Sequence, residues 1–535
     1  MTGRWIPDNG EDQAPAFGRQ PLSPLRFLER SATVHADRPA LRDGDLQLTY
    51  GEFASHCARF SGALSAAGVG EGDRVAVLAP NSAMAIAATF AVPLAGAVLV
   101  ALNTRLSADE LAFILGHAEA KLLIADGELE ELAGQALERS TADARLVIDG
   151  PSGDLDQQIA AAEPLRRERR DEWSLLSLNY TSGTTGKPKG VMYAHRGAYL
   201  QAQAMLAHSG LTSDSVFLWT LPAFHCNGWC FPWAVTAAGA THHCLRRVDP
   251  LEIWGAIREA NVSHLNAAPT VLGDLAASPA AALGPAPERV RVGTGGSPPS
   301  PALLEAMTVL NLEVTHLYGL TETYGPAVIC EWRHEWDDLP PVERARLKAR
   351  QGVPNLLGTE LRVVDSTGRD VLHDGETRGE VLLRGNNVML GYYRDPEATA
   401  AASHEGWFRT GDIGVLHPDG YLELRDRAKD VIISGGENIA SIEVEQVLAE
   451  HSAVFECAVV GAPHERWGEV PVAFVALRED AGASAEELIA HCRERLARYK
   501  APREVVFGPL AKTATGKVQK FALRERLRSG ERRGL

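Results

Sequence analysis

Residues 180–191 read YTSGTTGKPKGV, and they constrain the fold more than any other stretch of the sequence. They follow an apolar run at 175–179 that is typical of the end of a buried strand. They precede residues 194–208, where good helix formers dominate. The stretch itself contains three glycines, four hydroxyl side chains of Ser and Thr, and two lysines. A loop of this composition between a strand and a helix predicts a site for a polyphosphate, because backbone amides, hydroxyls and ammonium groups all bind anions.

The P-loop of nucleotide hydrolases is the nearest alternative motif, and it does not match. Gly183 and Gly186 are separated by two residues rather than four, and Pro188 follows Lys187 where a Ser or Thr is required. A flexible surface loop is the other alternative, but it does not explain so dense a pattern.

Length and charge restrict the class of protein. With 535 residues the chain is too long for one ordinary core, so we expect two or more domains. The 53 basic and 69 acidic residues give a net charge of −16, which argues against nucleic acid and anionic membranes as partners. An anionic substrate must therefore be bound by local Lys and Arg side chains.

The seven cysteines are odd in number and scattered, which indicates a reducing compartment and predicts a cytoplasmic protein. The first 20 residues are polar and have no apolar core of a signal peptide, so we expect a loose arm there. Residues 83–102 are twenty residues without a charge, long enough to span a bilayer. They are rich in Ala and contain Pro93 and Gly96, so we predict a helix and a buried strand of a β-α-β unit instead of membrane insertion.

Strand-like and helix-like runs alternate from residue 25 to about 148, which predicts a doubly wound α/β domain. One of its helices is expected to begin with a capping box formed by Ser107 and Glu110.

Residues 220–233, TLPAFHCNGWCFPW, raise the question of a zinc site, since His242, His243 and Cys244 follow shortly after. The spacing of Cys226 and Cys230 is looser than that of the usual zinc pair. Packing of aromatic side chains in a core would explain the Trp and Phe residues but not the His-Cys-Asn-Gly run between them.

Three later motifs combine a turn with groups that bind nucleotides. Residues 292–299 read as a strand followed by a glycine turn. In residues 316–323, Tyr318 offers a face for a base, Thr321 a hydroxyl for a phosphate, and Glu322 an oxygen ligand for Mg²⁺. Asp412 follows a glycine and is suited to accept hydrogen bonds from the two ribose hydroxyls, although an Asp in such a motif is usually only part of a turn.

Residues 424–430 contain five charges, a pattern that usually marks a solvated face. A strand and a glycine turn follow at 431–439, and residues 512–517 carry a lysine after a glycine in a Thr-rich loop.

In their order, these motifs resemble the signatures of the adenylate-forming superfamily, which contains acyl-CoA synthetases, peptide-synthetase adenylation domains and beetle luciferases. The resemblance runs from about residue 20 to the C-terminus. It is closest to short- and medium-chain fatty acyl-CoA ligases, because HCNGW, YGLTETYGP and GGENI occur together. It implies an α/β fold with a large N-terminal domain of doubly wound subdomains and a small, mobile α+β C-terminal domain. The expected boundaries are an arm at 1–20, the adenylation domain at 21–424, a hinge at 425–430 and the small domain at 431–535.

The resemblance also implies roles for individual residues. The catalytic residues are expected to be Lys517, His225 and Glu322, with Thr181 and Glu322 as metal contacts. The acyl pocket is expected to include His225, Cys226, Trp229, Tyr324 and Gly325, and the coenzyme A site Gly435, Gly436 and Trp467. Contact with coenzyme A through residues 499–503 is less well supported, because Ala501 stands where some relatives carry Arg. The residues expected to bind ATP and AMP are Thr181, Ser182, Gly183, Thr184, Thr185, Gly186, Lys187, Lys189, Gly296, Ser297, His316, Tyr318, Gly319, Thr321, Asp412, Arg427 and Lys429.

The implied activity is ATP- and Mg²⁺-dependent activation of a short- or medium-chain or aryl carboxylic acid as acyl-AMP, followed by transfer to coenzyme A as the small domain turns about Lys429. The alternatives are an adenylating enzyme with another acceptor or a small inorganic acid, such as nitrite with an amine nucleophile, and a nucleotide sensor without catalysis. The sequence leaves open which acid is used, whether the acceptor is coenzyme A, whether the pathway is catabolic or biosynthetic, and whether the chain forms a homodimer.

Overall fold

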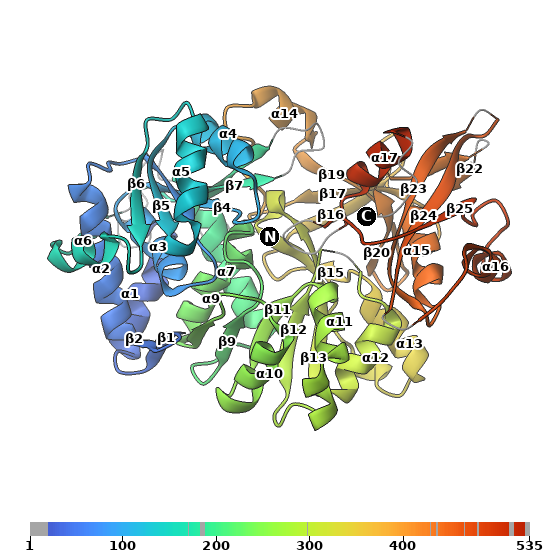
Figure 1. Ribbon diagram of the computed structural model, residues 1–535, viewed down its shortest axis with the longest axis horizontal. Coiled ribbons are helices and arrows are strands. Elements are labelled where there is room, and N and C mark those ends of the chain that lie inside the picture. The colour runs from blue at the N-terminus through green and yellow to red at the C-terminus, as the bar shows by residue number, and fades with distance from the viewer. Residues whose placement is uncertain are drawn as a thin grey trace, which may run out of the picture.

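The computed structural model describes residues 20–168, 171–181, 188–296, 298–427, 430–434, 437–464, 466–478, 481–512 and 518–529. The strands of these residues form four sheets, and the chain passes from a six-stranded and a nine-stranded sheet to two five-stranded ones (Figure 1).

The six-stranded sheet has the order β6-β5-β3-β4-β7-β8, parallel except for β8. Alternate residues of β3 enter different cores: Val75 and Val77 pack with α2 and α3, whereas Ala76 and Leu78 pack with α4 and α5. A parallel sheet covered by helices on both faces explains why its strands are nearly continuous hydrophobic runs. Its strands are β3 (Arg74–Leu78), β4 (Val98–Leu102), β5 (Ala120–Asp126), β6 (Arg145–Asp149), β7 (Leu175–Thr181) and β8 (Lys189–Ala194), and its helices are α2 (Tyr50–Ala66), α3 (Ala83–Leu94), α4 (Ala108–Ala118), α5 (Glu130–Arg139) and α6 (Leu155–Ala161).

This sheet confirms the helix and buried strand predicted at residues 83–102, where α3 leads into β4 beside β3. It also confirms the capping box, with Ser107 and Glu110 exchanging hydrogen bonds at the start of α4. The predicted unit at 25–148 is wrong in one respect: β1 and β2 leave it and join the nine-stranded sheet, because β1 pairs with β10, about 200 residues later in the chain.

The nine-stranded sheet has the order β15-β14-β13-β12-β11-β9-β10-β1-β2. Helix α7 follows β8 and links the two large sheets, and it matches the helix predicted after the signature loop. The strands are β1 (Pro39–Asp43), β2 (Leu46–Thr49), β9 (Val216–Trp219), β10 (Thr241–Cys244), β11 (His264–Ala267), β12 (Val290–Thr294), β13 (Leu312–Leu320), β14 (Gly325–Ile329) and β15 (Val353–Pro354), and the helices are α1 (Leu25–Val34), α7 (His195–Ser209), α9 (Phe231–Ala238), α10 (Pro250–Glu259), α11 (Pro269–Ala277), α12 (Pro301–Val309) and α13 (Pro341–Ala349).

Two smaller sheets complete the described chain, and the last lies at the right of Figure 1. The first contains β16 (Glu360–Val364), β17 (Gly379–Arg384), β18 (Ser403–His404), β19 (Trp407–Leu416) and β20 (Leu422–Arg427), with α14 (Pro396–Ala401) beside it. The second contains β21 (Ile432–Ser434), β22 (Glu437–Ile439), β23 (Val454–His464), β24 (Gly468–Leu477) and β25 (Glu504–Phe507), with α15 (Ser441–Ala449), α16 (Ala485–Arg495) and α17 (Lys520–Ser529).

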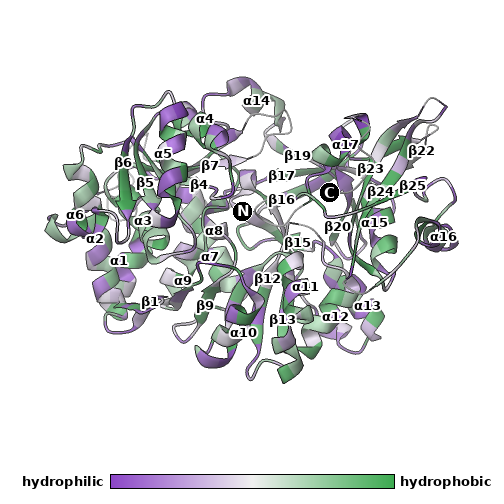
Figure 2. Ribbon diagram, in the orientation of Figure 1, coloured by the Kyte–Doolittle hydropathy of each residue, from purple (hydrophilic) through white to green (hydrophobic). Residues whose placement is uncertain are grey.

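Hydrophobic residues concentrate in the sheets and on the inner sides of the helices, while hydrophilic residues lie on the outer helix faces (Figure 2). In the part of the chain that the structure describes, no helix is both long and apolar enough to cross a membrane.

Candidate active site

The signature loop lies between two paired strand ends. Thr181, the last residue of β7, is the register partner of Lys189, the first residue of β8, so both ends of the loop are fixed side by side. Residues 182–187 fall outside the described residues, as do Ser297, Lys429, Gly435, Gly436 and Lys517, and their predicted roles stay predictions.

Asp412 is buried and is held between two side chains, the buried Tyr318 and the half-buried Arg427. The hydroxyl of Tyr318 donates to its Oδ2 at 2.7 Å, and Nε of Arg427 lies 3.1 Å from its Oδ1. Asp412 and Arg427 are register partners on β19 and β20, so the pair is set by the sheet and not by a turn. Burial and the charge of Asp412 raise the pKa of Tyr318 well above its usual value, which keeps its hydroxyl a donor. The group brings together three residues that we predicted to bind the nucleotide.

Glu322 lies in a single turn of 3₁₀ helix, Thr321–Thr323, directly after β13. The hydroxyl of Tyr392 donates to its Oε1 at 2.8 Å, and Nζ of Lys189 lies 4.9 Å from the centroid of the Tyr392 ring. The sequence analysis did not identify Tyr392. Its motif, GYYRDP, reads as an ordinary turn, and only the fold brings it to a residue 70 positions earlier in the chain.

Residues 226–230 form a left-handed turn. Their φ angles are +52° at Cys226, +48° at Asn227, +56° at Gly228, +58° at Trp229 and +65° at Cys230. Each residue with a Cβ costs roughly 1–2 kcal/mol in this region, so the turn must be held by its surroundings. Nδ2 of Asn227 donates to Oγ of Ser177 at 2.6 Å, and Sγ of Cys226 donates to Oγ1 of Thr321 at 3.3 Å. The HCNGW motif is therefore a strained element fixed to β7 and to the turn that contains Glu322.

The turn places the Trp229 indole between two glycines. A Cβ on Gly325 would lie 2.9 Å from Cδ1 of this indole, and one on Gly295 would lie 3.1 Å from its Cη2. Only residues without side chains allow so close an approach, which explains the glycines at both positions. Tyr324 is buried next to Gly325 and its ring stacks on that of Tyr193 at 3.8 Å between centroids. Trp229 thus packs directly against Gly325, next to the buried Tyr324, and the role of these three residues in the acyl pocket stays a prediction.

His225 is half-buried and borders a cavity of about 40 Å³. Asn103, Tyr180, Cys226 and Thr321 line the cavity together with apolar side chains. Burial raises the pKa of the Cys226 thiol to about 12, so this cysteine is protonated at neutral pH and unsuited to act as a nucleophile.

His316 and Trp467, two predicted site residues, lie in different surroundings. His316 is buried in β13, with Nδ1 at 2.9 Å and 3.0 Å from the carbonyl oxygens of Arg350 and Ala349, and burial lowers its pKa to about 4. Its visible contacts are structural, and its nucleotide role stays a prediction. Trp467 lies at the tip of the β23–β24 hairpin, where the guanidinium of Arg466 lies 4.8 Å from the centroid of its ring.

The question of zinc concerns Cys226, Cys230 and the residues that follow them. Burial holds the thiol pKa of both cysteines well above the usual value, so neither is a thiolate at neutral pH. Among the described residues, no three His, Cys, Asp or Glu side chains lie close enough together to bind a metal ion.

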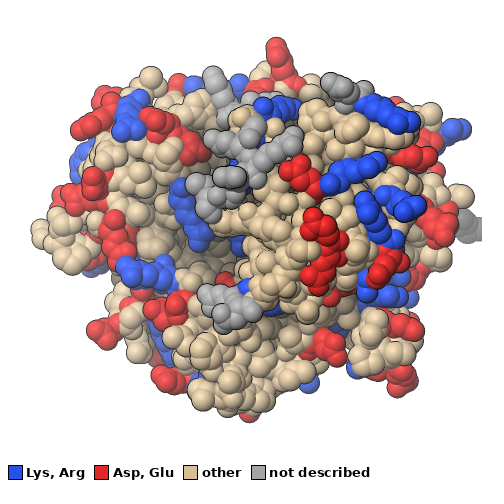
Figure 3. Space-filling model, turned by 45° about the vertical axis from the view of Figure 1, so that its right-hand side comes forward, with Lys and Arg blue, Asp and Glu red and all other residues tan. Residues whose placement is uncertain are grey.

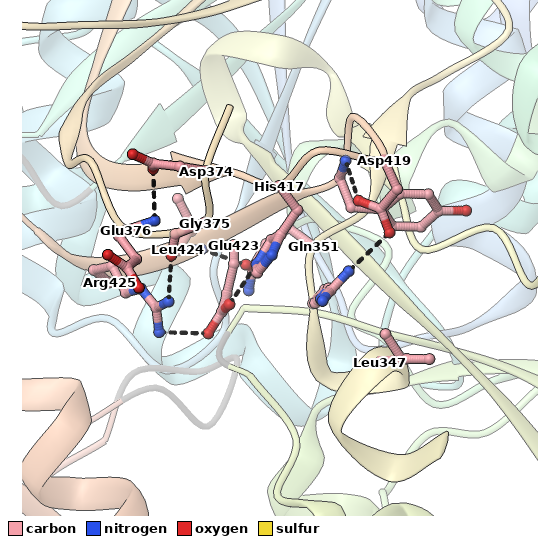
Figure 4. Close-up of polar contacts among 12 residues, drawn as sticks. Leu347, Gln351, Asp374, Gly375, Glu376, His417, Asp419, Glu423, Leu424 and Arg425 are labelled. Carbon is pink, nitrogen blue, oxygen red and sulfur yellow. Dashed lines mark hydrogen bonds and ion pairs between the residues drawn. The ribbon is translucent and has the colours of Figure 1, made fainter. Parts of the chain in front are cut away.

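The strand that leads to the predicted hinge is firmly anchored (Figure 4). Nε2 of His417 and Nη1 of Arg425 contact the two carboxylate oxygens of Glu423 at 2.7 and 2.6 Å, and Arg425 also donates to the carbonyl of Gly375. The side-chain carbonyl of Gln351 accepts from the backbone of Leu424. Residues 425–427, predicted as the start of the hinge, belong to strand β20, and the predicted hinge at 425–430 stays a prediction.

A second group of polar side chains links β20, which precedes residue 428, to α15 and α17, which follow it. The buried Asp426 carboxylate accepts hydrogen bonds from the backbone and the hydroxyl of Ser441, at the first residue of α15. The ammonium of Lys520, at the start of α17, donates to the same hydroxyl and lies 2.7 Å from Glu445. The network links the end of β20 to the helix that begins three residues after Lys517.

Positive charge gathers locally despite the net charge of −16. The face shown in Figure 3 is hollowed near its middle, and Lys and Arg side chains lie along one wall of the hollow. For a metal, Glu322 and the hydroxyl of Thr181 offer oxygen ligands, the kind that Mg²⁺ takes, so the residues present fit this ion.

Comparison with known proteins defines the class. The model of the AMP-binding enzyme family matches residues 28–393, and that of the AMP-binding enzyme C-terminal domain matches residues 443–517. The chain therefore belongs to the family of AMP-binding enzymes, which confirms the resemblance and the predicted α/β fold.

Individual relatives narrow the class further. An acetate–CoA ligase from Humulus lupulus is 43% identical over 555 residues, covering 98% of this chain and 97% of that protein. An acetate/butyrate–CoA ligase from Arabidopsis thaliana, named as peroxisomal, is 43% identical over 94% of both chains. Among solved structures, an anthranilate CoA ligase in complex with anthranoyl-AMP superposes with a TM-score of 0.85 at 27% identity, covering 97% of this chain and 100% of that one.

Proposed function

We propose that the protein is an ATP-dependent acid:CoA ligase that activates a short aliphatic carboxylic acid as acyl-AMP and then transfers the acyl group to coenzyme A. The activity follows from family membership and from relatives of almost the same length that are named as CoA ligases. The size of the acid rests on one observation, the cavity of about 40 Å³ that His225 and Cys226 line. Such a cavity has room for roughly a few non-hydrogen atoms. We assign Trp229, which lies between Gly295 and Gly325, to the boundary of the acyl pocket.

Activation of the acid as acyl-AMP provides a good leaving group. A thiol cannot displace oxide from a carboxylate, whereas AMP leaves readily from an acyl-AMP. We assign Asp412, held by Tyr318 and Arg427, to the ribose hydroxyls of the nucleotide. Glu322 and Thr181 would hold Mg²⁺, which would supply positive charge beside the departing pyrophosphate.

We assign Lys517 to the acid oxygen and the α-phosphate, where charge develops in the first step. Its removal should slow adenylation by roughly 10²- to 10³-fold, the usual effect of losing one preorganised donor. For the second step we propose that the small domain, residues 431–535, turns about Lys429, withdraws Lys517 and presents Gly435 and Gly436 to coenzyme A. The thiol of coenzyme A resembles a free cysteine and requires no dedicated base.

For the compartment we propose the cytoplasm, and the seven unpaired cysteines support this assignment.

The test is release of pyrophosphate across a panel of acids, from acetate to dodecanoate together with aryl acids and nitrite, each with and without coenzyme A. We expect the highest kcat/KM for acids of about two to five carbons, with the acyl thioester as the product identified by mass. Adenylation without a thioester would overturn the choice of acceptor. A preference for aryl or long-chain acids would overturn the size of the pocket.

A further inference from the structure

Residues 389–393 contact both strand β8, which follows the predicted phosphate-binding loop, and the turn that contains Glu322. Their backbone extends the edge of the six-stranded sheet: Leu390 donates to Met192, Met192 donates to Gly391, and Tyr393 donates to Gly190. At its start, the same segment is tied to the turn that contains Glu322, because the backbone of Met389 donates to the carbonyl oxygen of Glu322 at 2.8 Å. The backbone of Tyr392 is therefore fixed relative to both β8 and Glu322.

The Tyr392 side chain contacts one functional group on each side. Its hydroxyl donates to Oε1 of Glu322 at 2.8 Å, and its ring lies beneath Nζ of Lys189 at 4.9 Å from the centroid.

Orientation of Glu322 matters because it is the one carboxylate among the metal contacts that we assign. Within the described ranges, no His, Cys, Asp or Glu side chains cluster in groups of three or more that could hold a metal. Mg²⁺ in nucleotide sites is commonly held by one or two carboxylates and the phosphates, so the direction of a single carboxylate decides much of its affinity. A free glutamate side chain has three torsions and loses entropy when it is fixed by the ion, and a hydrogen bond already in place reduces that loss.

We propose that Tyr392 is a positioning residue for the site of adenylation: its hydroxyl orients the Glu322 carboxylate toward Mg²⁺, and its ring holds Lys189 at the end of the phosphate-binding loop. The inference rests on the metal-binding role that the proposed function gives to Glu322.

The first test replaces Tyr392 by Phe, which removes the hydroxyl and keeps the ring. In acid-dependent release of pyrophosphate, the Mg²⁺ concentration for half-maximal rate should rise roughly tenfold, the effect expected for a lost hydrogen bond to a charged group. Thioester formation from preformed acyl-AMP should be unchanged, because that step releases AMP and not pyrophosphate. Tyr393→Phe is the matched control, since this neighbouring ring packs on His117.

A binding measurement provides a readout independent of activity. Mn²⁺ titrated into the enzyme with ATP, with the free ion followed by electron paramagnetic resonance, should bind roughly tenfold more weakly to Tyr392→Phe than to the Tyr393→Phe control. Tyr392→Leu should add a rise of a few-fold in KM for ATP, because Lys189 then loses its aromatic contact.

Glu322→Gln distinguishes a failure of the positioning role of Tyr392 from a failure of the metal-binding role of Glu322. If it weakens Mn²⁺ binding while Tyr392→Phe behaves like the control, the positioning role is overturned and the proposed function stands. If Glu322→Gln leaves Mn²⁺ binding unchanged, Glu322 is not the metal ligand, and both the assignment and the inference fall. Equal KM values for ATP in Tyr392→Leu and Tyr392→Phe would overturn the part that concerns Lys189.

Discussion

Replacing Trp229 by Leu should lengthen the acids that the enzyme accepts. The indole is only 7% exposed and is packed against the backbone at Gly295 and Gly325, so its removal leaves space that the two glycines cannot fill. If this space admits two further methylene groups, each worth about 0.8 kcal/mol when buried, transition-state binding of the longer acid improves by about 1.6 kcal/mol. That difference corresponds to a factor of about 15 in kcat/KM.

The assay compares kcat/KM for hexanoate and butyrate in release of pyrophosphate at saturating ATP, so that each enzyme serves as its own reference. The ratio of hexanoate to butyrate should rise about 15-fold in Trp229→Leu. Trp254→Phe is the control, because Trp254 is buried in a different core and its indole nitrogen donates to the carbonyl of Leu275. An unchanged ratio, with both acids slowed equally, would show that Trp229 does not bound the acyl chain and would refute the reasoning.

Three further outcomes follow from the site. Asp412→Asn should raise KM for ATP by roughly 10- to 100-fold, because two hydrogen bonds to a carboxylate are weakened; an unchanged KM would remove Asp412 from the ribose site. Lys429→Pro should spare acyl-AMP formation and impair thioester formation, because proline fixes φ where rotation is needed; equal loss of both half-reactions in single-turnover assays would argue against this pivot. His316 should make the protein acid-sensitive, because its pKa is about 4 in the folded protein and 6.5 in the unfolded chain. The free energy of unfolding is therefore highest above pH 6.5 and falls by about 3 kcal/mol as the pH drops toward 4. His316→Asn should flatten the fall of Tm over that range.

Much of the fold could be predicted from periodicity and composition. The strand at 175–181, the helix that follows the signature loop and the capping box at Ser107 are local features, and local sequence determines them. The position of β1 could not be predicted this way, because its pairing with β10 depends on a strand about 200 residues away. A regular alternation of elements does not reveal which sheet an edge strand joins.

For the site, sequence patterns identified groups with evident chemistry and missed groups that act through others. Tyr318, Asp412 and Arg427 were predicted separately and are brought into contact by the pairing of β19 with β20 and by the position of β13. Tyr392 could not be identified from the sequence, because a tyrosine before a turn is common and has no single role. Only the fold shows that its hydroxyl donates to Glu322. The burial of Asp426 contradicts the ordinary meaning of a charge run, because its carboxylate accepts from the start of α15.

The left-handed turn at 226–230 also bears on how such an enzyme can change its substrate in evolution or by design. Four of its five residues carry a Cβ in a region that costs each of them roughly 1–2 kcal/mol, and the turn persists because Ser177 and Thr321 hold it. A segment of this kind cannot be lengthened or moved to another scaffold without those partners. Changes in acid preference should therefore accumulate as replacements of single side chains around Trp229, with the backbone of the pocket kept as it is.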